Sequence, residues 1–113
     1  MKLRMRVSCG DAVALGPGKI ALLEALDASG SITAAARRLG MSYRRAWLLV
    51  DELNAHLHEP AVATAQGGAR GGGSRLTPTG RELLRLYRAI EAAAAEHCRA
   101  DIAQLLGHFK PEP

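Results

Sequence analysis

The stretch Ile32–Leu53 constrains the fold more than any other part of the chain, because two helical segments meet there across a very short turn. Helices joined in this way cross at a steep angle and need a small side chain where their backbones approach, which Ala36 provides. The turn needs a residue that tolerates a left-handed backbone, and Gly40 satisfies that need. Ala46 and Leu49 then supply apolar side chains on the second helix. This spacing is typical of a helix-turn-helix.

The flanking segments complete one small domain, for which 113 residues are sufficient. The predicted helix-turn-helix covers about residues 31–57 and follows a predicted helix over residues 19–28. Residues 2–9 alternate between apolar and polar side chains, which predicts a half-buried strand, and residues 12–15 can return as its partner. A last helix is predicted over about residues 78–107, because Thr and Pro at its start have the chemistry of a helix cap and first turn.

A glycine-dense loop, residues 66–74, cannot form a helix and lies between two short segments suited to strands. It is not a phosphate-binding P-loop, because the lysine of that motif is missing. Its position one strand after the helix pair predicts a hairpin over about residues 61–76, the wing of a winged helix. A merely mobile surface hairpin is the alternative. The glycines that would let the wing backbone approach DNA are Gly67, Gly68, Gly71, Gly72 and Gly73.

The positive charge is unevenly distributed along the chain. The formal net charge is +4, and 12 of the 15 cations are arginine. Two stretches, residues 28–50 and 60–81, contain seven arginines and no acidic residue. Arginine suits bidentate contacts to phosphate and guanine, although a GC-rich genome explains the arginine excess equally well. The clustering of positive charge in these two stretches is stronger evidence for a nucleic-acid partner than the net charge is.

The candidate DNA contacts lie on both helices of the pair and on the wing. The second helix begins with four polar residues and has no acid before Asp51, as expected of a recognition helix in a major groove. Ser42 also suits a helix cap, and Tyr43 suits packing as well as contact; Trp47 is expected to pack against the core or the wing. The start of the first helix would offer its amides to phosphate. The predicted DNA-binding residues are Ser31, Thr33, Ser42, Tyr43, Arg44, Arg45, Arg70 and Arg75.

Apolar residues of the last helix recur at steps of four and three, as in a coiled-coil seam. A helix of roughly 28 residues extends about 42 Å, which is longer than so small a domain can cover. We therefore expect a homodimer, with a core role for the seam as the alternative. The predicted dimerisation residues are Leu83, Tyr87, Ile90, Ala94, Ile102 and Leu105. The expected fold class is mainly α: a winged helix-turn-helix with a β-hairpin wing and a long C-terminal dimerisation helix.

Other functions lack a residue pattern to carry them. No serine lies in a nucleophile elbow and the histidines lack zinc-site spacing, so no enzyme activity, metal or cofactor is expected. No apolar run approaches the roughly 18 residues that span a bilayer, and no signal core is present, so a cytoplasmic protein is expected. Cys9 and Cys98 are far apart and are expected to be buried thiols.

The sequence resembles the N-terminal winged-helix domain, a LysR-like winged helix, of the ModE-type molybdate-responsive transcription regulators. An SYxxAW recognition helix combined with a GGxxGGG wing carries most of this resemblance. It implies a dimeric transcriptional regulator that binds a palindromic operator in double-stranded DNA. The matching residues are Gly30-Ser31-Ile32, Ala35-Ala36, Gly40 to Trp47, Asn54, the five wing glycines, Leu76-Thr77, Gly80 and Leu86-Tyr87.

Regulators of that family continue beyond the position of Tyr87 into molybdate-binding domains, whereas this chain ends at Pro113. The resemblance therefore implies a single-domain relative that does not sense molybdate itself or that receives its signal from a separate effector-sensing protein. A piece of a longer regulator is the alternative. A different class of function is also open: a winged-helix assembly module that binds an acidic protein partner. Asp51 and Glu52 on the second helix give that reading slight support.

Overall fold

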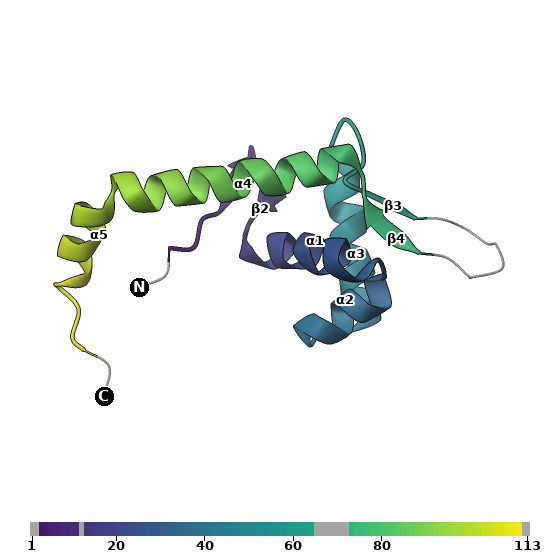
Figure 1. Cartoon of the computed structure of the whole chain (residues 1–113), viewed down its shortest axis with the longest axis horizontal. Helices are drawn as coiled ribbons and strands as arrows, with labels where there is room; N and C mark the ends of the chain where they lie inside the picture. The colour runs from purple at the N-terminus through teal and green to yellow at the C-terminus, as the bar shows by residue number, and fades with distance from the viewer. Residues whose placement is uncertain (1–2, 12, 65–72, 112–113) are drawn as a thin grey trace.

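The computed structural model describes residues 3–11, 13–64 and 73–111. These residues form five helices and four short strands, with two separate hairpins beside the helices (Figure 1). The expected fold class is confirmed: the chain is mainly helical, with a helix-turn-helix, a β-hairpin wing and a long C-terminal helix. None of the helices in the described residues is both long and apolar enough to cross a membrane.

The first two helices of the domain follow each other closely along the chain. Helix α1 (Pro17–Ser29) begins two residues before the predicted start, because Pro17 has the backbone angle of a first helical turn. Helix α2 (Ile32–Leu39) begins the predicted helix-turn-helix. Gly40 ends it with φ of +67°, so its left-handed backbone makes the short turn that the sequence predicts.

Helix α3 (Tyr43–Ala55) is the second member of the pair. Its buried residues are Ala46, Val50 and Leu53, which face α1 and α2. Asn54 lies near its end and binds the next segment: Oδ1 accepts hydrogen bonds from Ala61 N at 2.8 Å and Val62 N at 3.3 Å. Its Nδ2 donates to the Val62 carbonyl at 3.1 Å. A single amide side chain therefore fixes how the wing leaves α3.

The wing is an antiparallel pair of strands, β3 (Val62–Thr64) and β4 (Ser74–Leu76). Val62 pairs with Leu76, and Thr64 pairs with Ser74. Ser74 and Leu76 face inward, whereas the side chain between them faces solvent. The inward side chains join the wing base to the core.

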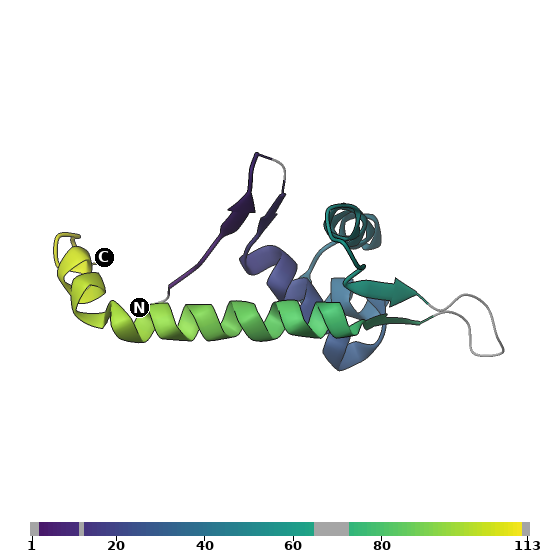
Figure 2. The same ribbon diagram turned by 90° about the horizontal axis from the view of Figure 1, so that it is seen from above.

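The N-terminal hairpin is shorter than the sequence predicts. Strand β1 (Val7–Cys9) pairs with β2 (Val13–Leu15), so only three residues of the strand expected over residues 2–9 are paired. Strand β2 ends at Leu15 because α1 begins two residues later, which leaves residues 3–6 without a strand partner. These residues run instead toward α4, as Figure 2 shows from above. Cys9 is exposed on this hairpin, so the expectation of a buried thiol there is wrong.

The hydrophobic core lies between α1, α2, α3, the wing base and the first half of α4. Ile20 and Leu26 of α1 are completely buried at its centre. Tyr87 of α4 is also buried, and its hydroxyl donates a hydrogen bond to the carbonyl of Met5. This bond holds the N-terminal segment against α4.

The last helix is not continuous to residue 107. It consists of α4 (Pro78–His97) and α5 (Arg99–Leu106), which separate at Cys98, and α5 turns sharply away from α4 (Figure 1). No residue of α5 is buried. The chain therefore offers no core surface that would keep the apolar repeat on one continuous helix. Cys98 is half-buried at the bend, so it is not the fully buried thiol that we expect.

Candidate nucleic-acid interface

The start of α3 is an exposed, positively charged turn. The Ser42 hydroxyl caps the helix by accepting a hydrogen bond from the Arg45 amide at 3.0 Å. Tyr43 is 53% exposed, and both Arg44 and Arg45 are exposed. No acidic residue lies in this first turn. The positive end of the helix dipole and the two guanidinium groups therefore act in the same direction.

The three polar side chains of this turn point in different directions. Tyr43 packs edge-on against Trp47, with ring centroids 6.2 Å apart, and both line a cavity beside α2 and the wing base. Arg45 lines a different cavity, on the side of Lys19 and the start of α1. Arg44 lies between these flanks, on the face of α3 opposite its buried stripe. Of the two arginines, Arg44 is therefore the one on the outward face.

Leu48 lies on that same outward face and is not among the residues that the sequence analysis selects. It follows Arg44 by one helical turn and is 56% exposed, whereas Leu49 is half-buried against the core. The sequence spacing draws attention to Leu49 as the apolar residue of this turn. A signal for Leu48 is nevertheless present, because it lies outside the stripe of Ala46, Val50 and Leu53. An exposed apolar side chain at this position can contact the methyl group of thymine.

The start of α2 lies next to the start of α3. Ser31 caps α2 through a hydrogen bond from the Ala34 amide at 3.1 Å. Ser31 and Thr33 line the same cavity of about 240 Å³ as Tyr43. The structure therefore brings together three residues that the sequence analysis assigns to DNA binding.

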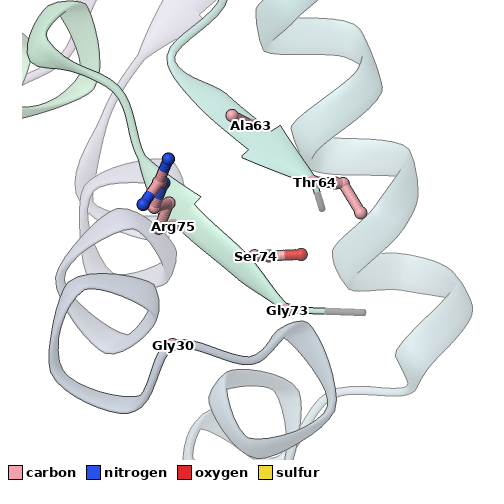
Figure 3. Close-up of a pocket in the computed structure, with 6 residues that line it drawn as sticks. All are labelled: Gly30, Ala63, Thr64, Gly73, Ser74 and Arg75. Carbon is pink, nitrogen blue, oxygen red and sulfur yellow. The ribbon is translucent and has the colours of Figure 1, made fainter. Parts of the chain in front are cut away.

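The wing residues are only partly within the described chain. Arg75 is exposed on β4 and projects from the side of the strand opposite to Ser74 (Figure 3). Gly73 lies beside the turn between α1 and α2, where the Ser74 amide donates to the Gly30 carbonyl at 3.1 Å. The remaining predicted wing residues, Arg70, Gly67, Gly68, Gly71 and Gly72, fall outside the described residues.

Glu52, one of the two acidic residues of α3, is paired with Lys19 of α1. Lys19 Nζ contacts Glu52 Oε1 at 2.6 Å and also donates to the Ala14 carbonyl at 3.1 Å. The hydrogen bond and charge of Lys19 lower the pKa of Glu52, with smaller contributions from His56 and Arg45. No ion pair within the described part of the chain involves the arginines of α2, the first turn of α3 or β4. These cations remain free to meet an anionic partner. They are Arg37, Arg38, Arg44, Arg45 and Arg75.

The predicted dimerisation residues occupy two different environments. Tyr87 is only 2% exposed and Leu83 packs against the core, so these side chains stabilise their own chain. Tyr87 is thus unavailable to a partner, because its ring and hydroxyl are both engaged inside the domain. Ile90 and Leu105 are exposed, whereas Ala94 and Ile102 are half-buried.

Similar proteins occur in bacteria. The family model of the LysR family of bacterial regulatory helix-turn-helix proteins matches residues 18–81, more than half of the chain. The molybdenum-pterin-binding protein MopB of Rhodobacter capsulatus is 48% identical over 82 residues, which cover 73% of this chain and 30% of that protein. The molybdenum transport protein ModE of Azotobacter vinelandii is 41% identical over 88 residues, 78% of this chain and 33% of that protein.

A third relative is the DNA-binding transcriptional dual regulator ModE of Escherichia coli K12, which is 41% identical over 71 residues. These cover 63% of this chain and 27% of that regulator. The chain thus spans about a third of the length of the relatives that it matches.

Within the described residues, no three His, Cys, Asp or Glu side chains gather closely enough to hold a metal ion.

Proposed function

Because the chain belongs to the LysR family of bacterial regulatory helix-turn-helix proteins, we propose that it binds double-stranded DNA and regulates transcription as ModE-type proteins do. One observation carries this proposal: the first turn of α3 is exposed, carries Arg44 and Arg45, and contains no acidic residue. A recognition helix enters the major groove with such a turn.

Each exposed side chain suits a particular part of the duplex. Arg44 on the outward face has the geometry for a bidentate contact to guanine, and Leu48 one turn later suits a thymine methyl group. Arg45 and Thr33 lie on the flanks, where the sugar-phosphate backbones run. Arg75 and, in the part of the wing outside the described residues, Arg70 are assigned to the backbone or minor groove beside the wing.

The proposed regulator is a homodimer on a palindromic operator. The second half of α4 lies beyond the core and exposes Ile90, while α5 contributes the exposed Leu105. Apolar side chains in these positions favour pairing with a second copy. Two heads related in this way would contact half-sites about 34–36 Å apart, one turn of DNA.

The proposed target genes handle molybdenum. Support comes from the relatives, whose names refer to molybdenum transport and to molybdenum-pterin binding. Sequencing the genomic DNA fragments that the chain retains tests this assignment. We expect them to lie beside genes for molybdate transporters or molybdenum enzymes, and fragments without such neighbours would contradict the link to molybdenum.

Duplex binding itself is testable with a site selected from a random DNA pool. Fluorescence anisotropy should show tighter binding to the selected duplex than to its scrambled version, and weaker binding to both as salt rises. Arg44→Ala should reduce the preference for the selected site by about 5- to 150-fold, the range for one bidentate arginine contact. Arg99→Ala, which removes another exposed arginine, from α5, is the control and should bind as the unmodified chain does.

Two results would contradict the proposal. If the unmodified chain shows neither duplex preference nor salt dependence, the surface does not bind DNA, as expected of an assembly module. If Arg44→Ala weakens binding to both duplexes equally, Arg44 contacts phosphate rather than bases.

A further inference from the structure

A second cavity lies between the N-terminal hairpin, the end of α3 and the start of α4. Its volume is about 340 Å³, and no Asp, Glu, Lys or Arg is among the described residues that line it. An apolar cavity of about 150 Å³ holds a benzene molecule, so this one has room for more than one large apolar side chain. We call it the hairpin cavity. Its apolar lining consists of Val7, Cys9, Leu15, Leu53, Leu57 and Leu83.

The hairpin forms an open wall of this cavity. All three residues of β1 are exposed, and Val7 among them is 48% exposed. In contrast, Leu15, Leu57 and Leu83 pack against the core and form the floor. An exposed apolar wall above an apolar floor is the kind of surface that another apolar surface covers.

Helix α5 carries an apolar stripe that the described residues do not cover. Ile102, Leu105 and Leu106 are spaced by three and four residues, so they lie on one face of the helix, and Gln104 lies on the opposite face. Leu105 is 60% exposed, and Phe109, just beyond the helix end, is 69% exposed. A helix with such a stripe is stabilised when the stripe packs against another apolar surface.

The straight course of α4 keeps α5 away from the hairpin cavity of its own chain. Leu83 lies near the start of α4, and the bend follows at Cys98. At about 1.5 Å per residue, the helix between them spans about 22 Å. Figures 1 and 2 both show α5 at the end of α4 that is remote from the helix-turn-helix and the wing. An α5 helix that fills this cavity therefore belongs to another chain.

We propose that α5 is an exchanged arm, whose stripe of Leu105, Leu106 and Phe109 inserts into the hairpin cavity of a second copy of this chain. This inference rests on the homodimer of the proposed function and names the surface that α5 contacts. The stripe and the cavity are both apolar, and each lacks a cover within its own chain. In a dimer with twofold symmetry, each arm meets the other copy's cavity in the same way, so both surfaces are covered at once.

The exposed side of α4 continues this contact surface. Leu83, Leu86 and Ile90 are spaced by three and four residues and lie along one side of the helix. Leu86 is 41% exposed and Ile90 is 51% exposed. Because each arm reaches the cavity beside Leu83 of the other copy, the two α4 helices lie side by side in opposite directions. Ile90 is then close to the middle of the overlap, so the two arm contacts and the α4 contact form one interface.

Disulfide trapping tests the arm contact, because Cys9 already lines the cavity. With Cys98→Ser as the background, Leu105→Cys should form a disulfide with Cys9 of the other copy when diamide oxidises the dimer. Gln104→Cys, on the opposite face of α5, is the matched control and should not, since a disulfide needs Cα atoms about 4.4–6.8 Å apart. Non-reducing electrophoresis measures the yield. Mass spectrometry of peptides from mixed ¹⁵N-labelled and unlabelled chains identifies the joined residues.

Two more variants extend the trapping along the stripe. Leu106→Cys and Phe109→Cys are oxidised in the same background, and at least one of the three stripe variants should join Cys9 between copies. The inference is wrong if none of them does. It is also wrong if the new thiols join one another, or if Cys9 joins the new thiol within one chain.

A charge on the stripe should weaken the dimer. Leu105→Glu should raise the dimer dissociation constant by about 10- to 150-fold, the factor for exposing a leucine that the contact buries. Gln104→Glu adds the same charge to the opposite face and should leave the constant unchanged. Val7→Glu places the charge on the cavity wall and should weaken the dimer as well, whereas Leu48→Glu on α3 should not. All four positions are exposed, so circular dichroism should show folded domains.

Sedimentation velocity separates the failure of this inference from that of the proposed function. A dimer that Leu105→Glu or Val7→Glu leaves unweakened would show that the arm does not enter the hairpin cavity, and the homodimer would stand. A chain that is monomeric at every concentration would overturn the homodimer and the arm contact together. Binding to the selected duplex is measured independently, so the DNA-binding part of the proposed function is decided by its own experiment.

Discussion

Gly80 lies so close to Ala61 that a Cβ atom on residue 80 would overlap the Ala61 carbonyl oxygen. The same oxygen accepts a hydrogen bond from the Thr77 amide at 2.9 Å, so it is fixed in place. Gly80→Ala should therefore destabilise the domain by about 1–3 kcal/mol, the usual cost of overpacking a core, when measured by urea unfolding.

Gly18 provides the control for that substitution. It is also helical, but a Cβ atom there would have nothing within 4 Å. Gly18→Ala should leave stability unchanged or raise it by about 0.4–1 kcal/mol, because alanine restricts the unfolded chain. Equal effects at the two glycines would show that backbone freedom, rather than the approach to Ala61, decides the outcome.

Tyr87→Phe should destabilise the domain by about 1–3 kcal/mol, because it removes the hydrogen bond from the hydroxyl and leaves the Met5 carbonyl without this donor. The N-terminal segment should then exchange its amide hydrogens faster, since that bond holds it to α4. Tyr43→Phe removes the same hydroxyl from a half-exposed ring and should change stability by less than about 0.5 kcal/mol. Calorimetry and hydrogen exchange measure both effects, and equal changes in the two variants would contradict this role of Tyr87.

The ion pair between Lys19 and Glu52 predicts a pH dependence of stability. Lys19 lowers the pKa of Glu52 from its ordinary value of 4.5, so the folded state binds this proton more weakly than the unfolded state. The contribution is therefore present above about pH 4.5 and is lost as the pH falls through the lowered pKa.

Unfolding curves of the unmodified chain and Glu52→Gln should accordingly differ most above that pH and converge below it. Asp51→Asn removes the neighbouring carboxylate, which forms no ion pair in the described residues, and serves as the control. A difference between the chain and Glu52→Gln that persists unchanged in acid would exclude the ion pair as its cause.

Ile90→Glu should convert the proposed dimer into monomer, because it places a charge on the exposed apolar part of α4. Ile90 is 51% exposed, so the substitution should not unfold the domain. Leu48→Glu makes the same kind of change at a similarly exposed position on α3, and it should leave the dimer intact. Sedimentation velocity measures the masses, and a dimer that survives Ile90→Glu would place the contact elsewhere.

The helix pair is predictable from sequence because its determinants are local. Gly40, the Ser42 cap and the buried stripe of α3 each act within a few residues of the structure that they specify. The role of Tyr87 is different, since it depends on a contact with Met5, 82 residues away. An apolar repeat cannot distinguish a residue buried in its own domain from one exposed to a partner.

The candidate site likewise combines features that local sequence predicts with features that depend on contacts between distant residues. The exposure of Arg44 follows from helical periodicity, but the burial of Ser74 becomes visible only when the wing base is placed against the turn between α1 and α2, where its amide donates to the Gly30 carbonyl. No proline or glycine lies at the bend at Cys98, so this bend has no signal in the sequence. Leu48 and Leu49 are identical in chemistry, and only their positions relative to the buried stripe of α3 indicate that Leu48 is the exposed one.

The three hydrogen bonds of Asn54 tie the end of α3 to the first residues of the wing. On DNA, the helix and the wing would consequently contact the half-site at a fixed separation. If a single base pair were inserted between the two contacts, either the helix or the wing would lose its contact. Tolerance of such insertions should therefore be low within a half-site, whatever bases are inserted.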